Sequence, residues 1–448
     1  MRSPLTSTAS LGRGFRALHN RNYRLFWFGQ LVSLAGTWMQ DVALSWLVLS
    51  LTESPVALGL TMTIRFLPAL LFSAFGGVLA DRLPKRRTLI VAQFLLALIA
   101  LATAVLISTD LITVGLIYLL AGIRGLVECV DGPTRQAFVS EMVESHDLPN
   151  AVALNSTLFS AARIAGPAIG AVVISTFGIA ACFYLNAVSF LGVIVALFAM
   201  RVSELFIVRR QDDSSGKGLN KVREGFRYAR TAPPVLVILL STAVLGTFGF
   251  SFQTSLPLIA RYMLSGDAST LAILMIAMGA GSVVAGLTAA YRGRPSQRLL
   301  LLAGASFGVL LFVVGLSHSL WSTTLLMFFL GVASILFLTS ANTRLQLLAP
   351  DHLRGRLLGI YVMFFIGTMP LGSYLTGQLA EALGVQLTLF ILAFLCLVGI
   401  TIAAVYATRS RTVGSLSART ATFPEPAAEA RLRAPRLGEE LDDLRAQE

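Results

Sequence analysis

Long apolar stretches, separated by short polar segments, recur along the whole chain and constrain its fold more than any other feature. A membrane-spanning helix needs about 20 mainly apolar residues, and twelve stretches have this length and character. They run approximately over residues 25–51, 56–80, 88–109, 111–130, 150–176, 180–200, 235–259, 269–291, 298–316, 320–341, 356–380 and 385–407. The sequence therefore predicts an all-α membrane protein with twelve transmembrane helices.

The composition excludes an ordinary soluble protein of this length. Of the 448 residues, 55% are hydrophobic and 13% are charged, whereas soluble proteins have about 25% charged residues. Alternating strands of about ten residues, the pattern of an outer-membrane barrel, are missing. The first apolar stretch, from Leu25 to Leu51, is too long for a signal-peptide core and is expected to remain as the first span.

The Lys and Arg residues lie almost entirely in every second loop. Segments on the side of the two termini hold 31 of the 35, and the opposite side holds only Arg261. Cytoplasmic loops of membrane proteins carry such an excess, so both termini are expected in the cytoplasm. Topology accounts for the net charge of +12 better than a nucleic-acid partner does, and none is expected.

The longest internal loop divides the predicted spans into two sets of six. The predicted organisation is a cytoplasmic segment 1–24, a six-helix half 25–200, a cytoplasmic linker 201–234, a second half 235–407 and a disordered cytoplasmic tail 408–448. A faint internal repeat, Pro133-Thr134-Arg135-Gln136 and Asn342-Thr343-Arg344-Leu345, falls where a duplication of the halves would place it. Many secondary transporters have this layout, with the substrate site between the halves near the middle of the membrane.

Two segments carry a resemblance to a known family. The loop Gly77-Val78-Leu79-Ala80-Asp81-Arg82-Leu83-Pro84-Lys85-Arg86-Arg87 resembles the signature cytoplasmic loop of the major facilitator superfamily, with Pro84 where that pattern usually has Gly. Gly166-Pro167-Ala168-Ile169-Gly170-Ala171 is similar to the antiporter motif of its exporters, with Ala171 in place of the last Gly. The segments Asn22–Trp27 and Gly225–Tyr228 resemble the branch that includes the enterobactin exporter and macrolide efflux permeases.

The resemblance implies two pseudo-symmetric six-helix halves and a secondary active transporter working by alternating access. It implies proton-coupled export of amphiphilic small molecules, of drug or siderophore type, from a monomer in the lipid bilayer of the bacterial plasma (inner) membrane. No cofactor and no metal are expected. The resemblance assigns one set of residues to a cytoplasmic gate. In the motif on the fifth span, Gly166 and Pro167 allow a helix bend and close packing, a structural role favoured over direct contact with substrate. The gate set is Gly77, Asp81, Arg82, Lys85, Arg86 and Arg135, and the bend set is Gly166, Pro167 and Gly170.

Ionisable residues inside the predicted spans are the candidates for proton coupling. Each costs at least about 2.5 to 3.5 kcal/mol at a helix centre, so each needs a partner or a function. Asp41 and Arg65 both lie roughly 15 Å below the outer surface, at 1.5 Å per residue, so they can pair if their helices face each other. Asp41 is then either a protonatable carboxylate or one side of a static ion pair, and the sequence leaves both interpretations open.

The fourth and fifth spans contain further charges. Arg124, Glu128, Asp131 and Arg135 are spaced to lie on one helical stripe, and Glu128 is a second proton-coupling candidate or a brace for the gate. Arg163 has no acidic neighbour in its own span, so its counterion is expected from another span or from an anionic ligand. The alternative is a structural cation bonded to backbone carbonyls.

Other function classes remain open at this point. The same fold would suit an uptake symporter or a lipid-type translocator, and a different class is a membrane sensor or scaffold that transports nothing. An enzyme is not expected, because the sequence has no nucleotide-binding loop of the Walker type and no cluster of His and Cys with metal-ligand spacing.

Overall fold

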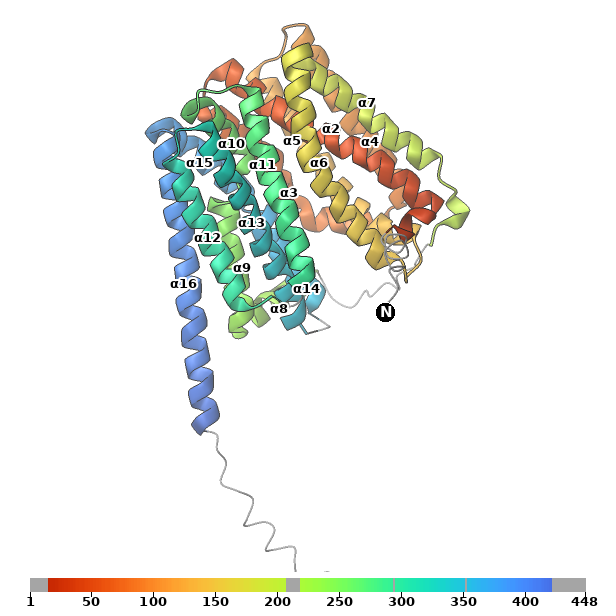
Figure 1. Ribbon diagram of the computed structural model, residues 1–448. Helices are drawn as coiled ribbons and strands as arrows, with labels where there is room; N and C mark the ends of the chain where they lie inside the picture. Colours follow the sequence, from red (N-terminus) through yellow and green to blue (C-terminus); the bar gives the residue numbers. More distant parts are fainter. Residues whose placement is uncertain (1–14, 207–217, 293–294, 351–352, 421–448) are drawn as a thin grey trace, which may run out of the picture. The chain divides into compact units, whose positions relative to one another are not determined.

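The structure of the chain is a computed structural model that describes residues 15–206, 218–292, 295–350 and 353–420. Within these ranges, the side chains of residues 73–82, 218–223, 290, 292 and 410–420 lie outside the described residues. In the described ranges every regular element is a helix and no strand occurs (Figure 1). The predicted all-α class is thereby confirmed.

The first predicted half contains six long helices. In chain order the elements are η1 (Arg16–His19), α2 (Arg21–Thr52), α3 (Pro55–Arg82), α4 (Lys85–Ser108), α5 (Val114–Met142), α6 (Leu148–Phe177) and α7 (Ile179–Phe198), followed by the short η2 (Val202–Glu204). The bounds of α2 have local causes. The Asn20 side chain accepts hydrogen bonds from the backbone N–H groups of Asn22 and Tyr23, and Glu53 adopts a left-handed conformation (φ 51°) that ends the helix.

The remaining elements include two broken spans. They are α8 (Gly218–Thr231), α9 (Pro233–Phe248), α10 (Phe252–Leu258), the π-helix η3 (Ile259–Met263), α11 (Ala268–Arg292), α12 (Gln297–Gly315), α13 (Leu320–Leu348), α14 (Arg354–Ile366), α15 (Met369–Leu383) and α16 (Val385–Thr420). The predicted seventh span 235–259 is divided into α9, α10 and η3, and the predicted eleventh span 356–380 into α14 and α15. Interrupted helices are a recurring feature of transporter substrate sites.

The count of twelve spans is not confirmed. Eleven helical segments in the described part of the chain are long and apolar enough to cross a membrane. The helix missing from this set is α5, the predicted fourth span, which is 29 residues long. Arg124, Glu128 and Asp131 interrupt its apolar sequence, so its composition alone does not identify it as a span.

Helix packing repeats between the two halves. Within the first half α3 packs against α5, and within the second half α11 packs against α13 at the equivalent place in the order of helices. Between the halves, α3 packs against α15 and α6 packs against α11. These two contacts are reciprocal, because each joins the second helix of one half to the fifth helix of the other. The arrangement fits the predicted pseudo-symmetry of the halves.

The interiors of the two halves differ in chemistry. The second half is packed around the Phe250 ring, whose centroid lies 5.3 Å from that of Phe307, 5.5 Å from that of Phe365 and 6.5 Å from that of Phe337. The first half instead buries charged residues on α2, α3 and α5. Among the described residues, the fully buried charges therefore lie in the first half.

Two compact units divide the chain, Met1–Ala404 and Val405–Glu448. Both sets of six predicted spans lie in the first unit, apart from the end of α16, and α16 continues to Thr420. Residues 421–448, most of the predicted tail 408–448, lie outside the described residues. The predicted boundaries at 24, 200, 234 and 407 remain predictions.

Candidate functional site

Four charged side chains from three helices meet inside the first half. Asp41 comes from α2, Arg65 from α3, and Arg124 and Glu128 from α5; we call these four residues the ion cluster. The side chains of Asp41, Arg65 and Arg124 are only 5 to 6% exposed, whereas that of Glu128 is 29% exposed. Asp41 and Arg65 were expected at the same depth in the membrane, and in the structure their side chains form an ion pair.

Arg65 is bonded to both carboxylates. Its Nη1 donates to Asp41 Oδ1 over 2.9 Å. On the other side, Nε and Nη2 donate to Glu128 Oε2 and Oε1 over 3.3 and 3.1 Å, so this contact is a two-point one. Arg65 therefore holds α2 and α5 together across α3.

Arg124 completes the ion cluster. Its Nε donates to Glu128 Oε1 over 2.8 Å, one helical turn along α5. Its Nη1 lies 2.9 Å from Asp41 Oδ1, but neither Nη atom of Arg124 makes a hydrogen bond within the described residues. The contact between Arg124 and Asp41 is consequently electrostatic rather than hydrogen-bonded.

Close approach of α3 and α5 makes these contacts possible. A Cβ atom at Gly125 would overlap the backbone oxygen of Arg65 and would lie 3.2 Å from Pro68 Cγ. Only glycine fits here, so Gly125 sets the distance between the backbones that carry Arg65 and Arg124.

The charges of the ion cluster balance, with two carboxylates against two guanidinium groups. Charges buried in low dielectric are tolerated when they are paired, and removing one partner strands the other. A proton bound by either carboxylate would leave the cluster with one excess positive charge. The arrangement can therefore convert the binding of a proton into the loss of ionic contacts.

A side chain from the second half reaches the ion cluster. Gln253 of α10 donates from Nε2 to Asp41 Oδ2 over 3.4 Å. Gln253 was not among the predicted site residues, because an uncharged amide does not stand out among ionisable residues inside the spans. The run of polar residues after α9, which includes Ser251, Gln253, Thr254 and Ser255, is the feature that would have indicated it.

A second polar group lies nearer the end of α5. Arg135 forms an ion pair with Asp131 on the same helix and donates to Gln30 Oε1 over 3.1 Å. Gln93 of α4 donates to Asp131 Oδ1 over 2.8 Å. The predicted stripe on α5 is thus divided between two clusters, and Gln30 and Gln93 are partners that were not predicted.

The predicted cytoplasmic gate is described only in part. Lys85 Nζ donates to Glu141 Oε1 over 2.6 Å, and Arg86 Nε donates to the backbone oxygen of Leu197 over 2.7 Å. These contacts tie the start of α4 to the ends of α5 and α7. Gly77, Asp81 and Arg82 lie in the part of α3 whose side chains are outside the described residues, so their roles in the gate remain predictions.

The predicted helix-bend motif lies where α6 packs against α2. Gly166 faces Ala35 and Trp38, and a Cβ atom there would lie 2.7 Å from the Ala35 backbone oxygen. A Cβ atom at Gly170 would lie at ordinary contact distance, 3.5 Å, from Met39. Pro167 lies inside α6, which is one helix from Leu148 to Phe177. Close packing is the role that these contacts support, and a bend remains a prediction.

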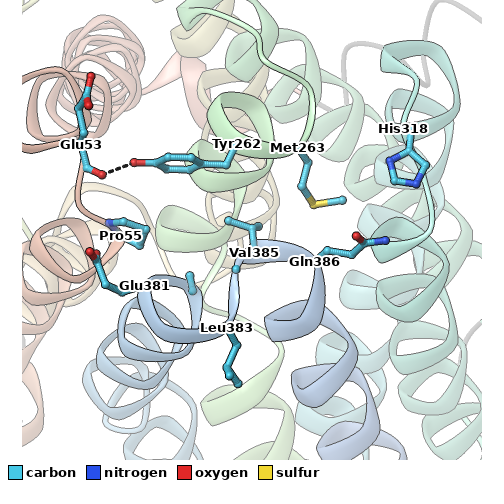
Figure 2. A pocket seen from close by; sticks show the side chains of 11 residues that line it. Glu53, Pro55, Tyr262, Met263, His318, Glu381, Leu383, Val385 and Gln386 are labelled. Carbon is cyan, nitrogen blue, oxygen red and sulfur yellow. Dashed lines mark hydrogen bonds between the residues drawn. The ribbon is translucent and has the colours of Figure 1, made fainter.

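A hydrogen-bonded contact joins the halves where α2 meets α3, a place that we call the Glu53 end. Glu381 of α15 accepts hydrogen bonds from the Ser54 hydroxyl over 2.7 Å and from the Val56 backbone N–H over 3.3 Å. The Tyr262 hydroxyl donates to the backbone oxygen of Glu53 (Figure 2). Glu53, Tyr262 and Glu381 border a cavity of about 540 Å³. We call the contacts of Glu381 with Ser54 and Val56 the latch.

Comparison with known proteins identifies the family. Residues 13–438 match the model of a family described as transmembrane secretion effector. The chain belongs to this family. The predicted membership of the major facilitator superfamily is thereby confirmed.

Three proteins that are similar to this chain are transporters. The staphyloferrin A transporter of Staphylococcus aureus is 26% identical over 82% of this chain and 92% of its own length. The multidrug efflux pump Tap of Mycolicibacterium fortuitum is 26% identical over 82% of this chain and 91% of its own. Macrolide efflux protein A of Streptococcus pyogenes is 22% identical over 80% and 89%.

A solved structure shares the fold. A bacterial homologue of the human lysosomal transporter Spinster, in an inward-facing and occupied conformation, aligns with a TM-score of 0.69. The alignment covers 86% of this chain and 96% of that protein at 11% identity. The chain is thus a multi-pass membrane protein with the major facilitator fold, and its relatives are transporters.

Proposed function

We propose that this chain is a secondary active transporter that exports amphiphilic small molecules in exchange for protons. The observation that carries the proposal is the ion cluster with its link to the second half through Gln253. A charge-balanced cluster buried in the membrane-spanning region changes its net charge when a carboxylate binds a proton. The link lets that change act on the contact between the halves.

Asp41 is the proton carrier in this proposal, and Glu128 is the second candidate. Asp41 contacts Arg65, Arg124 and Gln253, so its charge affects both other helices of the cluster and the second half. Protonation of Asp41 leaves two guanidinium groups beside one carboxylate, and their repulsion in low dielectric favours separation.

The placement of the latch supports alternating access. In this proposal the protein is a monomer in the bacterial inner membrane, and the Lys and Arg distribution supports an orientation with the Glu53 end outside and both termini in the cytoplasm. In this orientation the latch closes the outer end while the ion cluster is fully paired. This pairing suits a state that has released its proton inward and is ready to take up substrate from the cytoplasm.

The relatives support the substrate class and the direction. By their names, one is a multidrug efflux pump, one is a macrolide efflux protein and one is a transporter of staphyloferrin A. The gate residues Asp81, Lys85, Arg86 and Arg135 and the motif Gly166, Pro167 and Gly170 retain the roles that the superfamily resemblance assigns to them.

Everted membrane vesicles test the proposed function. An imposed pH gradient, acidic inside, should drive accumulation of at least one of a macrolide, ethidium and staphyloferrin A, and a protonophore should abolish it. Vesicles with the empty vector provide the control. Accumulation only in right-side-out vesicles would replace export by uptake, and identical results with and without the protein for all three compounds would contradict transport of this class.

A further inference from the structure

Arg163 differs from every other residue of the predicted intramembrane charge set. It lies at the midpoint of α6, which spans 30 residues, and is partly exposed. Arg65 and Arg124 each contact two carboxylates. Within the described residues, Arg163 has no carboxylate within ion-pair distance and donates no hydrogen bond, so no described side chain of another span supplies its counterion.

In the described part of the chain, the Arg163 guanidinium has one partner, an aromatic ring with which it makes a cation–π contact. Its Cζ lies 5.3 Å from the centroid of Trp38 on α2. A ring quadrupole attracts a cation but carries no charge, so the positive charge of Arg163 remains without a counter-charge. The guanidinium N–H groups also remain available, in the planar fork that matches a carboxylate or phosphate.

Arg163 lies far from both ends of α6 and close to the other half of the protein. The helix α6 packs against α11 of the other half. A Cβ atom at Gly279 of α11 would lie 3.7 Å from Arg163 Cγ and 2.9 Å from Ile164 Cγ1. The absence of a side chain at Gly279 therefore lets α11 pack closely against α6 beside Arg163, at the boundary between the halves.

We propose that Arg163 and Trp38 form the binding site for the anionic group of an amphiphilic substrate. The guanidinium binds a carboxylate or phosphate oxygen pair, and the indole ring of Trp38 contacts the apolar part next to it. The inference rests on the proposed function for the transport step, and it narrows the substrate class from amphiphiles in general to amphiphilic anions. Occupancy supplies the counter-charge that Arg163 lacks.

Equilibrium binding of a matched pair of probes tests the site. The purified full chain, in nanodiscs of zwitterionic phosphatidylcholine, is dialysed against 1-naphthaleneacetate and against the neutral 1-naphthaleneacetamide. We expect the wild type to bind the acid at least tenfold more tightly than the amide. Arg163→Gln should remove this preference and Arg163→Lys should retain it, because the lysine keeps the charge.

Two further variants separate charge recognition from general damage. Arg261→Gln is the matched control, since its guanidinium lies 5.6 Å from the Trp46 ring and is paired with Glu53 over 3.9 Å; it should bind like the wild type. Trp38→Leu should weaken the acid and the amide by similar factors and leave the preference intact. If Arg163→Gln does not fold, Trp38→Leu still tests the site. Loss of the preference for the acid in Trp38→Leu, which keeps Arg163, would overturn the assignment of that preference to Arg163.

The remaining outcomes are also decisive. Equal binding of acid and amide by the wild type, or a preference that survives in Arg163→Gln, would overturn the site. If 1-naphthaleneacetate no longer binds when phosphatidylglycerol is added to the nanodiscs, the site would be assigned to a lipid headgroup instead of a solute. Binding requires no pH gradient, so an intact acid preference in a protein that moves nothing in vesicles would count against the proposed function and not against the site.

Discussion

Gln253 of α10 lies with its Nε2 atom 3.4 Å from Asp41 Oδ2 on α2, so the ion cluster of the first half ends on a side chain of the second. The contact is long for a hydrogen bond, and the Gln253 Oε1 atom is buried without a hydrogen-bond partner in the described residues. A weak contact of this kind suits a position where the halves must separate and return.

Gln253→Leu tests whether this contact contributes to coupling. Loss of one long hydrogen bond to a carboxylate corresponds to about 1 kcal/mol, so transport driven by a pH gradient should fall by roughly fivefold while thermal stability stays near wild type. The measurement is initial flux in proteoliposomes, with Gln386→Leu, at the cavity of the Glu53 end, as the control. Equal flux in the two variants would contradict a role for Gln253.

Glu381→Leu tests the latch. The substitution removes the acceptor for Ser54 and Val56, and because these bonds are exposed the expected effect is about 1 kcal/mol, a fivefold shift toward conformations open at the Glu53 end. Spin labels at Leu51 and Leu383, in a background without Cys, should show a larger fraction at long distance by double electron–electron resonance.

Glu53→Gln is the matched control for the latch. Its carboxylate is 80% exposed and lies 3.9 Å from Arg261, while Tyr262 bonds the Glu53 backbone oxygen, which the substitution keeps. The distance distribution should therefore stay as in the wild type. An equal response of Glu53→Gln and Glu381→Leu would show that charge at this end matters and that the latch does not.

Gly125→Ala tests the close approach of α3 and α5. The added Cβ would overlap the Arg65 backbone oxygen, and overpacking of this kind costs about 1 to 3 kcal/mol. We expect a lower unfolding temperature in detergent and weaker transport. Gly115→Ala on the same helix has open space around its new Cβ, so it should unfold at or slightly above the wild-type temperature. A stable Gly125→Ala protein would contradict the geometry.

Asp267, in the loop before α11, gives a prediction of pH dependence. The backbone N–H of Thr270 donates to Asp267 Oδ1 over 2.9 Å, and this bond is the main cause that lowers the pKa of Asp267 below its ordinary value of 3.8. A carboxyl group whose pKa is lower in the folded than in the unfolded state stabilises the folded state at pH values above its unfolded-state pKa. That contribution is lost as the pH falls through its folded-state pKa. The difference in unfolding temperature between wild type and Asp267→Ala should be constant from pH 5 to 7 and shrink below pH 4. A difference in unfolding temperature that is the same at pH 3.5 and pH 7 would contradict a stabilising role for the hydrogen bond from Thr270 to Asp267.

The sequence was sufficient for the all-α class, the family resemblance and the common depth of two residues of the site. Counting residues from the helix ends gave a common depth to Asp41 and Arg65, and the high cost of an unpaired charge in the membrane made their pairing a reasonable expectation. Depth along a helix says nothing about rotation around its axis. The participation of Arg124 in the same cluster therefore emerged only from the packing of α3 against α5.

Contacts between the halves could not be predicted from sequence. Glu381 bonds Ser54 across 327 positions of the chain, and no local pattern encodes the pairing of α3 with α15. The breaks after Phe248 and Ile366 were also missed, because both spans are apolar enough to read as continuous helices. Arg163 was correctly singled out as lacking an acidic neighbour in its own helix, but only the packed structure shows that no other described residue supplies one.

The central claim, that Asp41 carries the coupled proton, is tested most directly by flux driven by a pH gradient in Asp41→Asn and in the double variant Asp41→Asn with Arg65→Gln. The single change strands a positive charge and should lower stability by about 3 to 5 kcal/mol, whereas the double change leaves Arg124 paired with Glu128 and should recover stability. If the account is right, both variants still bind substrate and neither shows driven flux in proteoliposomes. Recovery of driven flux in the double variant would contradict it and move the proton to Glu128.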